Sequence, residues 1–417
     1  MSKKNMFIFD LDGTLTQVET LPLIASKFGV TQQIEKLTLE TVNGNIPFVE
    51  SFIQRVAILG KLDVSKIALL LEDLLLFQNI VAFIQKYPEN CLVATGNFKG
   101  WVEKLVTQIG CTYYASDAIV ENDNIKKLTT ILKKEDIVKR YQAQGYNVVM
   151  IGDGNNDMEA MREADISIAS GLIHYPAQTI LSIADYAVFK EKTLLRLLDQ
   201  IQNQQSGTSL VLSCAGIGSR LGLDKTKALI EIDSQKLIHW QLEYFQKIED
   251  LRVVVGYQAN SVIKAVLEKR RDTLFVYNHD YFSTKTGTSF YLGSRDANEY
   301  VIGWDGDLIV DPKDIQRCLE YDGEYIGCSD IVTDDAVFVK VNESNEVVAF
   351  STKQGDYEWS GPAKLKKDKI KYISTNVYNQ IEEYLPLPML KITAQDIDTY
   401  DDYKKAIQFI RSFTNDK

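Results

Sequence analysis

Two pairs of aspartates in the first 160 residues have the spacing of a phosphoryl-transfer site. The pairs are Asp10 with Asp12 and Asp153 with Asp157, and each follows an apolar run typical of a buried strand. The carboxyl ends of parallel strands open on one edge of a sheet, so we expect the four carboxylates to lie together. One aspartate can attack phosphorus while another, two residues on, protonates the leaving oxygen.

The other groups that this chemistry needs follow in order along the chain. A third carboxylate shares Mg²⁺ with the attacking aspartate, and a lysine and a hydroxyl neutralise the phosphoryl oxygens. Thr95, after the strand pattern Cys91–Ala94, supplies a hydroxyl, and a lysine near position 134 supplies the ammonium group. The first half of the chain is therefore predicted to hold a Mg²⁺-dependent phosphoryl-transfer site.

A second constellation begins at the midpoint of the chain with a glycine loop. Gly216–Arg220 follows the apolar run Leu210–Leu212, and its two glycines let backbone N–H groups close on phosphate oxygens. Arg220 and Lys227 can offset the charge of those phosphates. A strand, a glycine loop and basic residues together predict a cradle for a triphosphate.

Two further pairs of carboxylates lie downstream of this loop. Asp305 and Asp307 follow the strand pattern Tyr300–Gly303, and Asp396 and Asp398 precede a predicted closing helix. A Mg²⁺ ion that bridges a nucleotide and carboxylates from separate strands is what nucleotidyl transfer requires. In that reaction an acceptor phosphate attacks the α-phosphorus and pyrophosphate leaves.

Composition narrows the class of protein. The 417 residues are 45% hydrophobic and 25% charged, and a chain of this length is expected to form two domains of about 200 residues each. The net charge of −11 argues against nucleic acid as a partner. The five cysteines are scattered and odd in number, which indicates reduced thiols. No apolar run reaches membrane-spanning length and no signal peptide pattern is present, so we expect a cytoplasmic protein without membrane insertion.

The order of the patterns predicts the α/β class. Apolar strand patterns alternate with helical ones in both halves, so each is expected to form a mainly parallel, Rossmann-like sheet. A helical stretch at about 16–80 interrupts the first half as a cap. The predicted domains are 1–201 and 208–417, joined by the polar segment 202–207.

Some charged residues are predicted to have no part in chemistry. His174, His239 and His279 lack the spacing of metal ligands or of a catalytic triad, so each is interpreted as a surface or core residue. The lysines at 364, 366, 367, 369 and 371 are interpreted as a solvated face, with a funnel for the acceptor phosphate as the alternative.

Residues 5–200, with the sequences DLDGTLT and GDGNND, resemble the haloacid-dehalogenase superfamily of phosphatases. The resemblance implies that Asp10 is the nucleophile and Asp12 the general acid/base. It implies that Mg²⁺ is held by Asp10, Asp12, Asp153 and Asp157, and that Lys134, with Lys133 as the alternative, is the catalytic lysine. The residues implied to bind the substrate phosphate and its surroundings are Thr95, Gly96, Asn97 and Asn156.

The helical cap resembles that of phosphoserine phosphatases. The likeness rests on Glu19 and on Gly44–Val56, which includes Arg55; the resemblance implies that the glutamate holds a substrate amine and the arginine a substrate carboxylate. Gly13 stands where serine is usual in that family, and Thr95-Gly96-Asn97 replaces a Ser-Gly-Gly turn. These departures argue against phosphoserine as the substrate.

Residues 208–412 resemble nucleotidyltransferases of the sugar-phosphate and phosphocholine type, which implies a GT-A-like fold. The signature G-x-G-[ST]-R…P-K-A-L is present, with Thr226 in place of its proline. The residues implied to bind the nucleotide are Ala215, Gly216, Gly218, Ser219, Gln258, Thr288 and Ser289. Lys227 and Arg220 are implied to be catalytic, Glu358 to bind the acceptor, and Asp307, Asp398 and Asp396 to bind metal, with Asp305 beside them.

Together these features predict a bifunctional enzyme with Mg²⁺ at both sites and CTP as co-substrate. UTP, GTP and dTTP remain open as the nucleotide, in which case the product is a nucleoside-diphosphate sugar. The expected partners are small phosphorylated metabolites and a nucleoside triphosphate, and an oligomer is compatible with the sequence. The predicted product is a CDP-activated small alcohol, amino-alcohol or sugar for a surface polysaccharide or lipid headgroup. The alternative from another class is that one domain is a non-catalytic, metabolite-binding regulator.

Overall fold

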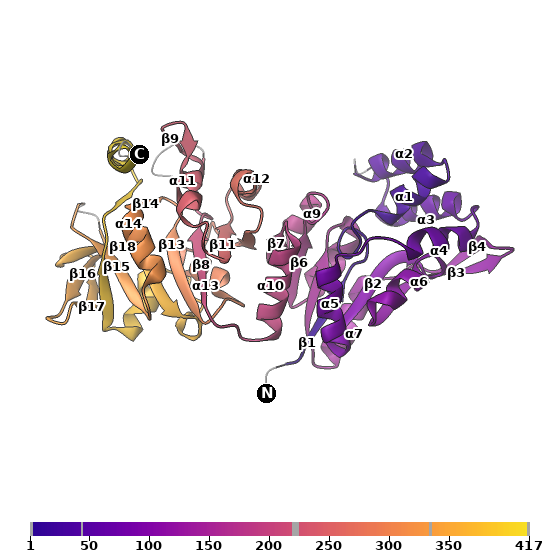
Figure 1. Cartoon of the computed structure of the whole chain (residues 1–417), viewed down its shortest axis with the longest axis horizontal. Helices are drawn as coiled ribbons and strands as arrows, with labels where there is room; N and C mark the ends of the chain where they lie inside the picture. Colours follow the sequence, from indigo (N-terminus) through magenta and orange to yellow (C-terminus); the bar gives the residue numbers. More distant parts are fainter. Residues whose placement is uncertain (1–2, 43–44, 219–224, 333–335, 415–417) are drawn as a thin grey trace. The chain divides into compact units, whose positions relative to one another are not determined.

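A computed structural model describes residues 3–42, 45–218, 225–332 and 336–414. The chain divides into two compact units, Met1–Leu195 and Arg196–Lys417 (Figure 1). The boundary falls within helix α10 (Glu191–Gln202). Across the described part of the chain, no helix combines the length and the apolar character that crossing a bilayer would need.

The sheet of the first unit has the strand order β7-β6-β5-β1-β2-β3-β4, and every pair is parallel except β3 with β4. Phe7, Ile8 and Phe9 of the central strand are fully buried, because a parallel strand is covered on both faces. The strands are β1 (Asn5–Phe9), β2 (Cys91–Phe98), β3 (Thr112–Glu121), β4 (Asn124–Thr130), β5 (Asn147–Gly152), β6 (Ile166–Ser170) and β7 (Tyr186–Val188).

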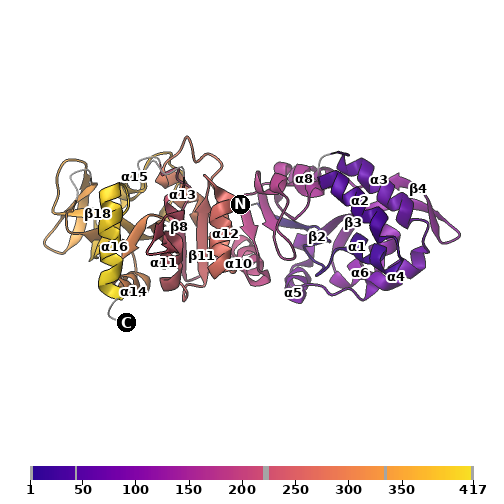
Figure 2. The ribbon, with the colours of Figure 1, turned by 90° about the horizontal axis from the view of Figure 1, so that it is seen from above.

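The stretch predicted as a helical cap contains α1 (Thr20–Lys27), α2 (Thr31–Val42), α3 (Phe48–Leu59) and α4 (Val64–Glu72). These helices gather at one end of the first unit, beside the β3–β4 hairpin (Figure 2). The remaining helices of the unit are α5 (Gln78–Lys86), α6 (Lys99–Ile109), α7 (Lys134–Ala143), α8 (Met158–Glu163) and α9 (Gln178–Leu181).

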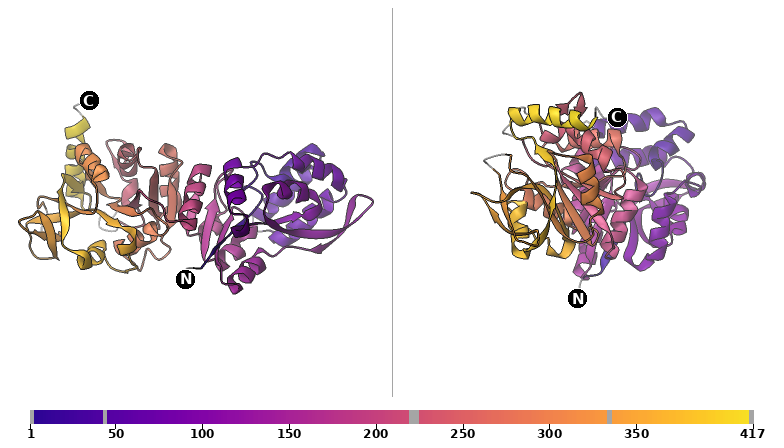
Figure 3. Two further views of the ribbon diagram at one scale, coloured as in Figure 1. Left: turned by 60° about the horizontal axis from the view of Figure 1, so that its bottom comes forward. Right: turned by 60° about the vertical axis from the view of Figure 1, so that its left-hand side comes forward.

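The cap also contains a β-hairpin, which the sequence pattern did not indicate. β3 begins in the sheet beside β2 and continues outward to pair with β4 (Figure 3). The hairpin is bonded to the cap, because Val64 N–H donates to the Asp123 carbonyl and Ile125 N–H donates to the Gly60 carbonyl.

The second unit has a parallel half and an antiparallel half. The parallel half, β12-β11-β8-β13, consists of β8 (Thr208–Ser213), β11 (Asp250–Val255), β12 (Leu274–Tyr277) and β13 (Tyr300–Asp305). In the other half β18 (Tyr357–Lys366) runs antiparallel to β13, and beside it lie β15 (Tyr325–Ser329), β16 (Phe338–Val341), β17 (Glu346–Ser351) and β19 (Leu387–Lys391). These strands pair antiparallel apart from β15 with β19, which is a parallel pair.

The described part of this unit also contains two small ribbons and several α-helices. β9 (Glu231–Ile232) pairs with β10 (Gln235–Lys236), and β14 (Leu308–Val310) pairs with β20 (Ala394–Asp396). The helices are α11 (Leu237–Tyr244), α12 (Ala259–Lys269), α13 (Thr286–Ser294), α14 (Pro312–Glu320), α15 (Val377–Ile381) and α16 (Tyr400–Thr414). The predicted α/β class with two sheets is confirmed.

A buried ionic network fastens the end of α10 to the second sheet. Arg252 Nε donates to Asp250 Oδ2 at 2.9 Å, and both side chains are fully buried. Gln200 Nε2 also donates to Asp250 Oδ2, at 2.8 Å, and Arg196 lies 2.9 Å from Asp250 Oδ1. Burial alone would raise the pKa of Asp250, but Arg252 and Arg196 outweigh it and lower that pKa to about 2.

We expect Asp250→Asn to lower the free energy of unfolding of the second unit by about 3–5 kcal/mol, as does removal of one partner of a buried ion pair. Since the pKa of Asp250 is lowered on folding, its carboxylate stabilises the unit fully above about pH 4, and this contribution is lost as the pH falls towards 2. The difference between variant and wild type should shrink over that interval. Urea unfolding at several pH values measures it.

The control is Asp233→Asn, which breaks the exposed ion pair of Asp233 with Arg411. Water screens that pair, so the control should shift the urea midpoint far less. Equal midpoints for wild type and Asp250→Asn would contradict the role assigned to the network.

Candidate active sites

The first site lies at the carboxyl edge of the first sheet. Lys134, in the first turn of α7, donates from Nζ to Asp10 Oδ1 and to Asp157 Oδ1, each at 2.5 Å. All three side chains are buried, whereas the neighbouring Lys133 is exposed. Of the two lysines proposed from the sequence, the structure therefore brings Lys134 to the carboxylates.

The site holds more negative than positive charge, and burial together with repulsion between the carboxylates raises the pKa values of three of its aspartates. Burial, followed by the charge of Asp157, raises the pKa of Asp10 well above its ordinary value, even though Lys134 acts in the opposite direction. Burial also raises the pKa of Asp12 to about 7 and that of Asp153 to about 6. A divalent cation would relieve this excess of negative charge.

The donor set fits Mg²⁺. Oxygens of Asp10, Asp153 and Asp157 lie within 4.8 Å of one another, and carboxylate oxygens are the ligands that this hard ion prefers. Among these residues Asp157 is held in place by the backbone, since its Oδ2 accepts from the N–H groups of Asp153 and Gly154 at 3.2 Å.

Asn97 orients the side chain of Asp12. Its Nδ2 donates to Asp12 Oδ2 at 2.5 Å and to Thr20 Oγ1 at 3.0 Å, while Thr20 N–H donates to Asp12 Oδ1 at 2.9 Å. The backbone N–H of Asn97 donates to Thr95 Oγ1 at 3.1 Å. One asparagine thus links the predicted acid/base to the predicted phosphate-binding hydroxyl.

The other predicted residues of this site lie around the carboxylates. Gly96 follows Thr95 in β2, and its carbonyl accepts from Ser116 Oγ at 2.7 Å. Asn156 lies in the 3₁₀ turn Asn155–Asp157. Arg55 of α3 is desolvated, which lowers its pKa, and the charge of Glu19 acts on it in the opposite direction.

His174 joins the site although the sequence predicts for it only a surface or core position. Its Nε2 lies 2.9 Å from Glu19 Oε1 and 2.9 Å from Asp153 Oδ2. These contacts raise the pKa of His174 to about 10, with the bond to Asp153 the largest cause. The sequence does offer one signal that His174 belongs to the site. It follows the strand pattern Ile166–Ile168, and other site residues also follow strands of this sheet.

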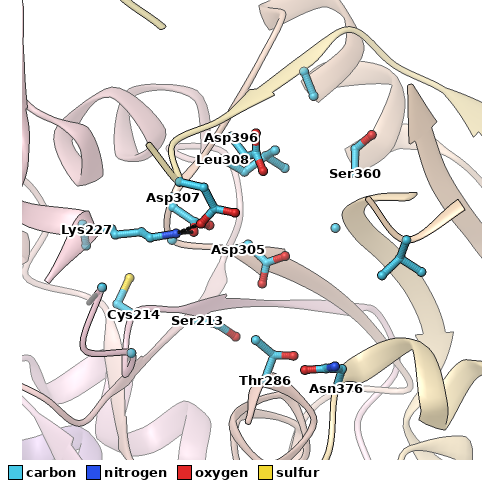
Figure 4. A pocket seen from close by; sticks show the side chains of 18 of the residues that line it. Ser213, Cys214, Lys227, Thr286, Asp305, Asp307, Leu308, Ser360, Asn376 and Asp396 are labelled. Atoms are coloured by element: carbon cyan, nitrogen blue, oxygen red, sulfur yellow. Dashed lines mark hydrogen bonds and ion pairs between the residues drawn. The ribbon is translucent and has the colours of Figure 1, made fainter. Parts of the chain in front are cut away.

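The second site is an open cavity of about 1040 Å³ in the second unit (Figure 4). Most of the residues predicted from the sequence line it: Ala215, Gly216, Gly218, Lys227, Ser289, Asp307, Glu358, Asp396 and Asp398. Ser219 and Arg220 lie outside the described residues.

Two predicted nucleotide-binding residues are absent from this lining. Thr288 turns its hydroxyl to the Ile373 carbonyl, to which it donates at 2.7 Å. Gln258 precedes α12, and its Oε1 accepts from the Thr226 N–H at 3.4 Å. Thr288 therefore connects α13 to the backbone at Ile373. Gln258 contacts the loop that precedes Lys227.

Lys227 is held between two carboxylates at the centre of the cavity. Its Nζ lies 2.6 Å from Asp307 Oδ2 (Figure 4). The same atom is also paired with Asp398. Asp305 lies beside them, and burial followed by the charge of Asp307 raises its pKa to about 7. Burial likewise raises the pKa of Asp396 to about 6.

Packing fixes the last pair of acids. Ile397 is fully buried in a cluster with Ile309 and Ile410, and alternation along an extended segment directs Asp396 and Asp398 away from it. The carboxylates of this cavity are the donor type that Mg²⁺ prefers, and Asp307, Asp396 and Asp398 are the residues that would hold the ion. These three are not among the described groups whose ligand atoms all lie within 4.8 Å of one another.

The cavity has further lining residues that sequence reasoning missed. Asn376 and Tyr378 come from α15 and its N-cap, and Lys405 comes from α16. These residues are far from the glycine loop in sequence and match no local pattern. Only the tertiary fold brings them to it.

The lysine run at 364–371 is not the uniformly solvated face that was predicted. Lys364 is only 5% exposed and donates to the Tyr321 carbonyl at 2.6 Å, and Lys369 pairs with Glu324 at 2.5 Å. The run is absent from the described cavity lining, so the funnel alternative gains no support.

Comparison of the sequence with known protein families gives a match within the first unit. Residues 4–165 match the model of haloacid dehalogenase-like hydrolases. A phosphoserine phosphatase of Methanocaldococcus jannaschii is 28% identical over 182 residues, which are 40% of this chain and 85% of that protein. The chain spans between 44% and 59% of the length of several other phosphoserine phosphatases that it matches. The N-terminal half thus carries a haloacid dehalogenase-like hydrolase domain, as predicted.

Solved structures that resemble the chain include two transferases of cytidine nucleotides. The CTP:phosphocholine cytidylyltransferase of Streptococcus pneumoniae is 19% identical with a TM-score of 0.40, over 49% of this chain and 99% of that one. The inositol-1-phosphate CTP transferase of T. maritima is 18% identical with a TM-score of 0.43, over 51% and 99%.

We expect Gly13→Ala to destabilise the first unit more than Gly29→Ala does. Both glycines have positive φ (66° and 74°), so each substitution costs about 1–2 kcal/mol of backbone strain. A Cβ at Gly29 meets no atom within 4 Å, but one at Gly13 would overlap the Asp153 carboxylate. Gly13→Ala should therefore also weaken Mg²⁺ binding.

Thermal unfolding of both variants with and without Mg²⁺ separates the two effects. The Gly29→Ala variant is the matched control for strain alone. If the two variants lost equal stability and equal stabilisation by Mg²⁺, the crowding of Asp153 would be ruled out.

Proposed function

We propose that the chain is a bifunctional cytoplasmic enzyme, a phosphomonoester phosphatase joined to a nucleotidyltransferase. The observation that carries the proposal is the same in both units: a lysine lies between two carboxylates at the carboxyl edge of a parallel sheet. The family match of residues 4–165 supports the first activity.

In the first site Asp10 would attack phosphorus and Asp12 would protonate the leaving oxygen. Lys134 holds the Asp10 carboxylate at a fixed position, and Asn97 holds that of Asp12. The raised pKa of Asp12, about 7, suits a group that carries a proton near neutral pH. Mg²⁺, held by Asp10, Asp153 and Asp157, would supply charge neutralisation at the phosphoryl group.

In the second site the glycine loop would bind a triphosphate, and an acceptor phosphate would attack the α-phosphorus with release of pyrophosphate. Lys227 lies where it can neutralise the phosphates once Asp307 and Asp398 turn to Mg²⁺. We infer CTP as the nucleotide, and UTP, GTP or dTTP with a sugar-1-phosphate as the alternative.

The cavity favours an acceptor with a positively charged end, such as an amino-alcohol phosphate. Trp359 and Tyr378 line it with their ring centroids 6.2 Å apart, and aromatic faces attract ammonium groups. The neighbouring Glu358 carboxylate is fixed by Ser329 and by the Val332 N–H. The product would be a CDP-activated precursor for a surface polysaccharide or a lipid headgroup.

The two activities should be separable. Asp10→Asn should abolish phosphate release and leave pyrophosphate release unchanged, because Asp10 belongs to the first unit alone. Lys227→Ala should lower nucleotidyl transfer by about 10²-fold or more, as loss of transition-state charge stabilisation does, and spare the phosphatase. Phosphate and pyrophosphate are followed separately in one screen of phosphomonoesters with each nucleoside triphosphate.

Circular dichroism and thermal unfolding confirm that each variant is folded. A folded variant that loses both activities would disprove two independent sites. A chain in which Lys227→Ala changes nothing would support the alternative that the second unit is a non-catalytic module.

The phosphatase should spare the transferase's own acceptor, which is itself a phosphomonoester. Glu19, Arg55 and His174 present charged groups at the opening of the first site, and a substrate that leaves them unpaired is disfavoured. We therefore expect the best acceptor to be hydrolysed slowly by the Lys227→Ala chain, and faster after Arg55→Ala.

The measurement is kcat/KM of the phosphatase for that acceptor and for its best substrate. Exposed Lys66, which pairs with Asp63 at the start of α4, offers a control in the cap: Lys66→Ala should leave the ratio unchanged. Hydrolysis of the acceptor as fast as the best substrate would refute discrimination.

A further inference from the structure

We propose that Glu19, Asp153 and His174 form a binding site for a borderline-soft divalent ion such as Zn²⁺, beside the Mg²⁺ ligand set. His174 Nε2 lies 2.9 Å from Glu19 Oε1 and 2.9 Å from Asp153 Oδ2. One ligand atom from each of the three residues lies within 4.8 Å of the others. This proposal adds a metal site to the phosphatase unit and does not depend on its substrate.

The imidazole, which releases its Nε2 proton to solvent when an ion binds there, decides which ion the site selects. The neighbouring Mg²⁺ set offers only oxygens, from Asp10, Asp153 and Asp157. Mg²⁺ prefers such oxygens, whereas Zn²⁺ binds well to a mixed set of imidazole nitrogen and carboxylate oxygen, at about 2.0–2.2 Å. Because its ligands include the imidazole nitrogen of His174, the Glu19–Asp153–His174 group should prefer a softer ion than the all-oxygen Mg²⁺ group does.

Three separate segments bring the ligands together. Glu19 precedes α1, Asp153 follows β5, and His174 lies in the segment between β6 and α9. The absent side chain at Gly13 keeps the space open, since a Cβ there would overlap Asp153 and lie 3.2 Å from Glu19 Oε1. The half-exposed ring of His174 leaves a route for an ion from solvent.

Asp153 belongs to both ligand sets, which couples the two ions. A shared carboxylate can bridge metals about 3.5–4 Å apart, as in two-metal sites. A Zn²⁺ ion on Glu19 and His174 would also draw Glu19 away from Arg55 and from the substrate. We therefore expect Zn²⁺ to lower phosphate release even when Mg²⁺ is saturating, and to do so less after His174→Ala.

The first test is equilibrium dialysis of the full-length chain against Zn²⁺ in a large excess of Mg²⁺. Wild type should retain Zn²⁺ at this site, and His174→Ala should weaken that binding by at least about 10-fold. The matched control is His279→Ala, which removes a histidine that stacks on Tyr277 in the other unit, and it should bind as wild type does. Equal binding by wild type and His174→Ala would overturn the proposal.

The second test needs no variant. Anomalous scattering at the zinc edge, from wild-type crystals soaked in Zn²⁺ with excess Mg²⁺, should give a peak about 2.0–2.2 Å from His174 Nε2. A peak only among Asp10, Asp153 and Asp157 would assign Zn²⁺ to the Mg²⁺ ligands and overturn the proposal. Either result stands whether or not the unit hydrolyses phosphomonoesters.

Discussion

A lysine ammonium group between two carboxylates organises each half of this chain. Lys134 holds Asp10 and Asp157 together, and Lys227 does the same for Asp307 and Asp398. Burial acts to lower the pKa of both lysines, but their carboxylate partners outweigh it and raise both values, so each lysine stays charged. Removing such charges from water is costly unless they are paired. The strands, loops and helices around each site therefore have to deliver three groups to one point.

Much of this arrangement could be predicted because the acids follow strands. Asp10, Asp153 and Asp307 each come after an apolar run, and the carboxyl ends of parallel strands open on the same edge of a sheet. Lys134 could be proposed as the catalytic lysine only from the resemblance to the haloacid-dehalogenase superfamily, because a lysine at the start of a helix forms no recognisable sequence pattern. The structure decided between it and Lys133 by burial.

The sequence was least informative where distant segments meet. His174 follows a strand, but no spacing relates it to Glu19, which lies 155 residues earlier. Thr288 sits in a motif-like segment, yet its hydroxyl bonds to the carbonyl of Ile373. The direction in which a side chain points depends on packing, and packing is a property of the folded chain. The β3–β4 hairpin was likewise not predicted from the sequence.

Strand β3 connects the core sheet to the cap. Its inner end pairs with β2, and its outer end forms the hairpin that is bonded to the cap helices. Where β3 passes from its pairing with β2 to its pairing with β4, Ser116 donates to the carbonyl of Gly96 and accepts from the N–H of Leu132, two residues before Lys134. One serine side chain therefore joins the strand that leads out to the cap both to the end of β2, which carries Thr95, and to the residues just before α7.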